Sequence, residues 1–228
     1  MEEQLRRIHE HMRGLGLGAL AHANTHACFY SHDNLWWAEL SVLQAAHAAE
    51  LLIKARIAEE HPLLIFEQLP KARTESGQLL SLQDLVQTAR SYQFSDLPDR
   101  LWAVSGLKLS NGERFRTFGR LRNAIQHFAV PEGVDVTAES ILFIYEVVDP
   151  FINDCWGLFA VDFNEDTEPE YLVQGLIARA VRFRVSPSVA EREKYIDFRW
   201  PDNEPGYQKE MEGRFVAASA TADRDRSG

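Results

Sequence analysis

The chain has 228 residues, of which 45% are hydrophobic and 11% are aromatic. This composition is enough for one well-filled core and argues against a disordered chain. The formal net charge of −10 repels a polyanion at long range, which disfavours an extended nucleic-acid binder. The longest nearly uncharged apolar run, residues 141–145, is far shorter than the roughly 18 to 20 residues of a membrane span, so we expect a soluble protein without membrane contact.

Two further features predict a cytoplasmic protein. The first residues are charged and helical in character, without the apolar segment of a secretory signal. The two cysteines, Cys28 and Cys155, are far apart in a chain that is long enough to fold without a covalent cross-link. We therefore expect no structural disulfide.

The N-terminal part of the chain predicts two helices. Residues 2–13 have the pattern of a short amphipathic helix, which Gly14, Gly16 and Gly18 are expected to interrupt. The strongest helical pattern covers residues 35–60, after a run of capping residues and before a proline. Its predicted apolar stripe consists of Trp36, Leu43, Ala46, Ile53 and Ile57.

Shorter elements are expected next along the chain. The motif Ser81-x-x-Asp84 resembles a capping box and opens a helix. The predicted buried face of that helix consists of Leu82, Leu85, Val86 and Ala89. The other expected features are a short helix over 63–69, a polar loop over 71–77, a helical turn over 98–104 and a loop over 110–112.

Two more helices are expected after this region. The first covers residues 113–128 and is closed by the turn at 131–133. The second begins near Thr137 and carries apolar residues at helical spacing as far as Ile152. Pro150 is expected to kink it, because proline has no N–H for the helical hydrogen bond.

These elements predict an all-α protein, a helical bundle of about five core helices with a C-terminal extension. The predicted division is an N-terminal lead-in of residues 1–29, the bundle of residues 30–157, the extension of residues 158–216 and a disordered tail of residues 217–228. Within the extension, we expect a solvated acidic loop over 162–170 and one more helix over 171–183.

The helix over 113–128 carries the most informative side chains. At 100° per residue, Arg116, Arg120, Asn123 and His127 fall within about 60° of one another. Between residues 99 and 127 the chain has six basic and two acidic residues, a local charge of +4. Because imidazole transfers protons near neutral pH and a guanidinium stabilises a developing anion, this face suits phosphodiester chemistry.

Arg122 is predicted to lie inside the apolar arc of the same helix. The arc consists of Phe115, Phe118, Leu121, Ile125 and Phe128. A guanidinium keeps its charge, so its burial requires a carboxylate or several acceptors. Two interpretations stay open: a solvated arginine face with Arg122 extending to water from the edge of the core, or a functional site.

The segment Arg122-Asn123-Ala124-Ile125-Gln126-His127 resembles the arginine-to-histidine motif of the HEPN superfamily, in the form where a polar residue follows the arginine. The setting is also similar, because members of that superfamily are helical bundles in which an earlier long helix bears a charged residue that helps to hold the site. Here the corresponding residue is Glu50, on the apolar stripe of the helix over 35–60. The resemblance covers roughly residues 30–157.

The resemblance implies RNA cleavage without a metal ion or cofactor, at a composite site where two motifs meet in a homodimer. His127 would transfer the proton of the ribose 2′-hydroxyl, Arg122 would hold the phosphate oxygens, and Asn123 would orient the imidazole or the phosphate. Glu50 would orient the arginine of the motif. Further RNA contacts are expected from Arg116 and Arg120.

The same analogy implies a toxin or a stress or defence effector, with an antitoxin or regulatory protein as a further partner. The toxin branch that pairs with nucleotidyltransferase-like antitoxins usually has a tyrosine two residues after the histidine. This chain has Ala129 there, which argues against that branch.

Alternative interpretations stay open at this stage. One is a non-catalytic HEPN module that binds RNA, a nucleotide or a protein partner, which the net charge of −10 slightly favours. Another is a helical scaffold unrelated to the superfamily. Glu50 also has a purely structural interpretation, as the partner of Lys54 one helical turn later.

No metal site is predicted from the sequence. His22, His26, Cys28 and His32 are residue types that bind metals, but their spacing matches no zinc pattern. The acidic residues of 162–170 lack the glycine turn of a calcium loop.

Overall fold

The computed structural model describes residues 3–71, 80–165, 169–193, 198–202, 204 and 206–225. These residues are mostly helical, with a small antiparallel sheet formed by β1 (Phe66–Gln68) and β2 (Arg90–Ser91). The prediction of an all-α protein is therefore confirmed. Among the described helices, none combines the length and the hydropathy that a bilayer crossing requires.

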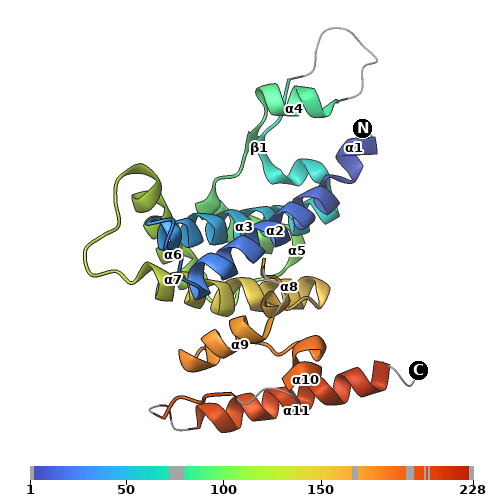
Figure 1. Cartoon of the computed structure of the whole chain (residues 1–228). Coiled ribbons are helices and arrows are strands. Elements are labelled where there is room, and N and C mark those ends of the chain that lie inside the picture. The colour runs from blue at the N-terminus through green and yellow to red at the C-terminus, as the bar shows by residue number, and fades with distance from the viewer. Residues whose placement is uncertain are drawn as a thin grey trace.

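The centre of the molecule is a helical hairpin formed by α2 (Ile8–Cys28) and α3 (Trp37–Glu60), preceded by the short α1 (Glu3–Arg6) (Figure 1). Half of the 24 residues of α3 are buried, because α2 and three later helices all pack on it. Its many buried alanines allow these neighbours to approach closely. The helix predicted over 35–60 is confirmed, but its predicted apolar stripe is wrong at Trp36, which precedes α3 and is 67% exposed.

The prediction that glycines interrupt the N-terminal helix is wrong, because α2 continues through Gly14, Gly16 and Gly18. Gly16 is buried against α3, and a Cβ atom there would lie only 2.8 Å from the Cγ atom of Leu52. At the other two glycines, a Cβ atom would meet no described atom within 4 Å. The glycine at 16 thus permits close helix packing, and the helix expected in the N-terminal lead-in contributes side chains to the core.

The next segment differs from its prediction in two places. The prediction of a short helix over 63–69 is wrong, because a 3-10 turn (Pro62–Ile65) leads directly into β1. The N–H of Tyr92 donates a hydrogen bond to the carbonyl of Ile65. Helix α4 (Leu82–Thr88) begins with the predicted capping box. Its predicted buried face is wrong at Val86, which is 77% exposed. Of the loop predicted over 71–77, residues 72–77 lie outside the described residues.

Helices α5 (Leu97–Ser105) and α6 (Gly112–His127) confirm the helical turn predicted over 98–104 and the helix predicted over 113–128. Phe115 and Phe118 of α6 are buried, as the apolar arc predicted. Phe128 is 88% exposed, because the helix ends one residue before it and the helical projection no longer applies there.

The helix predicted from Thr137 contains an irregular turn. Helix α7 (Val136–Phe143) leads into a π-helical turn (Ile144–Val148) and then into α8 (Asp149–Trp156). Pro150 has no N–H to donate to the carbonyl of Glu146, one turn earlier. The hydroxyl of Ser110 donates to that carbonyl at 2.5 Å, so a loop residue replaces the missing donor.

The C-terminal helices form a layer below the bundle in Figure 1: α9 (Pro169–Ala178), α10 (Pro187–Glu193) and α11 (Tyr207–Asp225). Helix α9 ends earlier than the helix predicted over 171–183. Residues 217–225 of the predicted disordered tail belong to α11, and residues 226–228 lie outside the described part of the chain. Its side chains Tyr207, Met211 and Phe215 are buried at helical spacing against the rest of this layer.

A buried carboxylate connects the bundle to this layer. Asp149 accepts hydrogen bonds from the N–H of Ala160 at 2.8 Å and from the N–H of Arg184 at 3.1 Å. Burial raises the pKa of Asp149 to about 6, against the opposing effect of the two hydrogen bonds. The start of α8 is thereby bonded to two segments that follow it in the chain.

The role of Gly16 gives a test of the hairpin packing. We expect Gly16→Ala to lower the free energy of unfolding by about 1–3 kcal/mol, because the added methyl group overlaps Leu52. Gly18→Ala is the matched control in the same helix and should raise that free energy by about 0.5–1 kcal/mol, since the added methyl group is unobstructed. Urea unfolding followed by circular dichroism measures both values. Equal stabilisation by the two substitutions would contradict this packing.

Candidate functional site

A cleft with a volume of about 400 Å³ lies between α6 and the segment of residues 91–95. Five of the six residues predicted to form the site line it: Glu50 from α3, and Arg116, Arg120, Arg122 and Asn123 from α6. The sixth, His127, is not among the described lining residues. The fold thus collects the predicted basic residues in one place but leaves the predicted proton carrier outside it.

Gly119 determines how closely the wall of the cleft approaches α6. A Cβ atom at this position would lie 3.0 Å from the ring of Phe94. That ring stacks on the ring of Phe115, with centroids 4.2 Å apart, which limits its freedom to move aside. Sequence reasoning missed the segment 91–95 as a cleft wall. A glycine inside an otherwise regular helix was the signal of a close approach.

The arginines of the cleft have no carboxylate partners among the described residues. Arg120 donates to the hydroxyl of Thr117 at 3.0 Å, and Arg122 donates to Oδ1 of Asn123 at 3.0 Å. For Arg116 no described side chain accepts a hydrogen bond. Because a guanidinium has five N–H donors, most of the donors in this cleft are available to an external anion.

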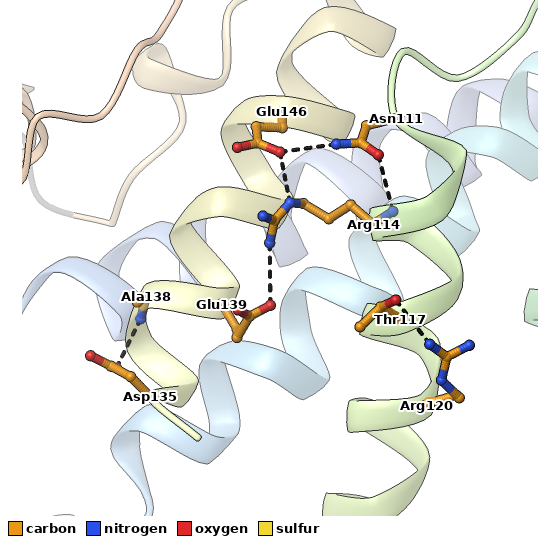
Figure 2. Close-up of polar contacts among 8 residues, drawn as sticks. All are labelled: Asn111, Arg114, Thr117, Arg120, Asp135, Ala138, Glu139 and Glu146. Carbon is orange, nitrogen blue, oxygen red and sulfur yellow. Dashed lines mark hydrogen bonds and ion pairs between the residues drawn. The ribbon is translucent and has the colours of Figure 1, made fainter. Parts of the chain in front are cut away.

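Arg114, on the same helix, has the opposite character. It donates to the carboxylates of Glu146 at 2.7 Å and Glu139 at 3.2 Å, and Figure 2 shows both contacts. Asn111 caps the start of α6 by accepting from the N–H of Arg114, and also donates to Glu146 at 3.1 Å. This network fastens the N-terminus of α6 to α7 and to the π-helical turn, whereas Arg120 points away from it (Figure 2).

Glu50 pairs with Lys54, as its purely structural interpretation predicts. Its carboxylate accepts a hydrogen bond from Nζ of Lys54 at 2.7 Å, and the same ammonium group donates to Ser91 of the cleft wall at 3.2 Å. Lys54 is only 6% exposed. Within the described part of the chain, no hydrogen bond or ion pair joins Glu50 to Arg122. The two residues share the cleft without a direct bond.

His127 is the last residue of α6 and is exposed. Its ring contacts the ring of Phe128 edge-on, with centroids 6.4 Å apart. The imidazole therefore lies at the open end of the basic helix face, next to a large apolar side chain that is also exposed.

One group of metal-ligating residues lies together in the described residues: His22, His26 and Glu165. The sequence set that included Cys28 and His32 is not the one that the fold assembles. Burial raises the pKa of Cys28 to about 12, which keeps it a thiol. Glu165 belongs to the segment predicted as a solvated acidic loop, and it pairs instead with His22.

Comparison of the chain with protein-family models, with curated proteins and with solved structures finds no match. The fold and the cleft therefore describe the protein as an all-α protein with an arginine-lined cleft, and they define no narrower class.

The Glu50–Lys54 pair gives a test of what holds the back of the cleft. We expect Glu50→Gln to lower the free energy of unfolding by about 1–3 kcal/mol, because it leaves a buried ammonium group without its carboxylate. Adding Lys54→Met should restore most of this loss, since the double variant buries no charge. Thermal unfolding measures the cycle, with the exposed Glu132→Gln as control. Unchanged stability of Glu50→Gln would show that the pair contributes nothing.

Proposed function

We propose that the protein is an endoribonuclease of the HEPN type, which cleaves RNA without a metal ion. The observation that carries the proposal is the cleft, in which Arg116, Arg120 and Arg122 have no carboxylate partners among the described residues and lie beside Asn123. Guanidinium groups with available donors bind phosphate oxygens, often through two parallel hydrogen bonds. The motif from Arg122 to His127 supplies the link to HEPN chemistry.

In the proposed reaction, the ribose 2′-hydroxyl attacks the adjacent phosphate and the 5′-oxygen of the next nucleotide leaves. His127 removes or delivers the proton, and Arg122 stabilises the charge that grows on the non-bridging oxygens. Asn123 orients the phosphate or the imidazole, while Arg116 and Arg120 hold flanking phosphates. DNA is not cleaved by this route, because it lacks the 2′-hydroxyl.

The proposed active form is a homodimer with a composite site, as the HEPN resemblance implies. His127 does not line the cleft of its own chain, and a second copy would bring another imidazole to the arginines. Phe128, which is 88% exposed directly after His127, is suited to the contact between two copies. On family analogy alone, the setting is a toxin or a stress or defence response with an antitoxin or another regulatory protein.

A second candidate is a non-catalytic HEPN module that binds RNA, a nucleotide or a protein partner. The position of His127 outside the cleft favours it, because binding of an anion needs the arginines but no proton carrier. A volume of about 400 Å³ also lies within the usual range for small-molecule sites. Tight nucleotide binding without any cleavage of RNA would favour this candidate.

The first functional prediction concerns the mechanism. The purified protein should cleave RNA in excess EDTA and leave 2′,3′-cyclic phosphate ends. His127→Ala should lower the rate by about 10² or more, the usual contribution of a general acid-base group. His47→Ala, at an exposed position on α3, is the control and should cleave as the parent protein does. Activity that disappears with the chelator and returns with magnesium would refute this mechanism.

The second functional prediction concerns assembly. Arg122→Ala and His127→Ala chains should each be inactive, and their mixture should recover at most about a quarter of the parent activity. That limit follows because half of the randomly mixed dimers contain both variants, and each of these has one intact site. Light scattering should show a dimer for all three proteins. A monomer that still cleaves RNA would contradict the composite site.

A further inference from the structure

Two histidines and a carboxylate meet on the face of α2 that is opposed by the chain after α8. His22 and His26 are one helical turn apart, and their ring centroids are 6.1 Å apart. Nδ1 of His22 lies 2.5 Å from Oε1 of Glu165. One ligand atom from each of His22, His26 and Glu165 lies within 4.8 Å of the other two.

The loop that carries the carboxylate is fixed to α2 by hydrogen bonds. The side-chain amide of Asn24, which is fully buried, donates to the carbonyls of Ala160 at 2.9 Å and Phe163 at 2.7 Å. The hydroxyl of Thr25 accepts from the N–H of Glu165 at 3.1 Å. The position of Glu165 above the two histidines is therefore set by the residues between them in the sequence.

One ring nitrogen of His26 has no partner within the described part of the protein. Nδ1 of His26 is buried and has no hydrogen-bond partner among the described residues. The ring packs against Trp37, with centroids 3.9 Å apart, which restricts its rotation. A buried polar atom without a partner is costly and is rare in folded proteins.

We propose that His22, His26 and Glu165 bind one divalent transition-metal ion of the zinc type. Two imidazoles and one carboxylate form an established ligand set for such ions, with a further coordination position open to water. Magnesium and calcium are disfavoured, because they prefer oxygen ligands.

The geometry allows this binding after small side-chain movements. Zinc lies about 2.0–2.2 Å from nitrogen and oxygen ligands, so two ligands of a tetrahedral ion are about 3.4 Å apart. His22 and Glu165 separate slightly from their direct contact, and the widest pair closes from its present spacing. Both side chains are partly exposed, which leaves them free to make this adjustment.

The bound ion would connect α2 to the loop that leads into the C-terminal helices. It shares no residue with the arginine-lined cleft, so it does not depend on the proposed ribonuclease activity. Its expected effect is on stability, because an ion that binds only the folded chain raises the melting temperature.

The experiment titrates the metal-free full chain with Zn²⁺ at pH 7.5, using isothermal calorimetry. We expect one ion per chain, and each of His22→Gln and Glu165→Gln should weaken binding at least tenfold. Because both side chains are partly exposed, the two substitutions should leave the fold intact, which circular dichroism checks. His26→Gln is the third variant, and His47→Gln on the exposed surface of α3 is the control.

Two further measurements complete the test. Zn²⁺ at one hundred times its dissociation constant should raise the melting temperature by about 5–10 °C, and Mg²⁺ should not. Co²⁺ should give a visible absorption spectrum that His22→Gln and Glu165→Gln abolish. The proposal is overturned if Zn²⁺ does not bind, or if it binds equally to the three variants and the control. In either of those cases, His22 and Glu165 make a direct side-chain contact only.

Discussion

The close contact between α2 and α3 is the constraint on which the rest of the structure depends. Gly16 of α2 lies so near Leu52 of α3 that no larger residue fits without movement, and buried alanines line the rest of the seam. Other core helices then pack on further sides of α3, so half of its 24 residues are buried. Lys54 lies on a buried side of this helix, which explains why it needs the carboxylate of Glu50.

The arginines of α6 differ in the partners that they contact. Arg114 is neutralised by Glu146 and Glu139, and the resulting network fixes the start of the helix. The arginines that follow face the cleft without such partners among the described residues, beside the wall that Gly119 allows to approach. The N-terminus of α6 is therefore fixed by ion pairs, while the arginines of its cleft face are free to bind a ligand. Such rigid placement is what a binding or catalytic site requires.

The loop after α8 connects the two layers of helices. Asn24 of α2 bonds two of its carbonyls and accepts a hydrogen bond from the hydroxyl of Tyr145 at 3.0 Å. Asp149 holds the N–H of Ala160 from the other side. These buried polar contacts satisfy the backbone of an irregular segment that would otherwise lose its hydrogen bonds to water. They also bring Glu165 to the histidines of α2.

The sequence by itself determined the long helices α3 and α6, the capping box at Ser81, and the basic face of α6, because each follows from local periodicity or capping chemistry. Only the tertiary structure decided what depends on distant partners. Gly16 lies inside a helix and against α3, the apolar side chains of α11 are buried, and Glu165 contacts His22 although the two are far apart in the sequence. Likewise, Glu50 bonds Lys54 and shares a cleft with Arg122. Burial and pairing of this kind depend on the packing energy between distant segments, which local sequence patterns do not show.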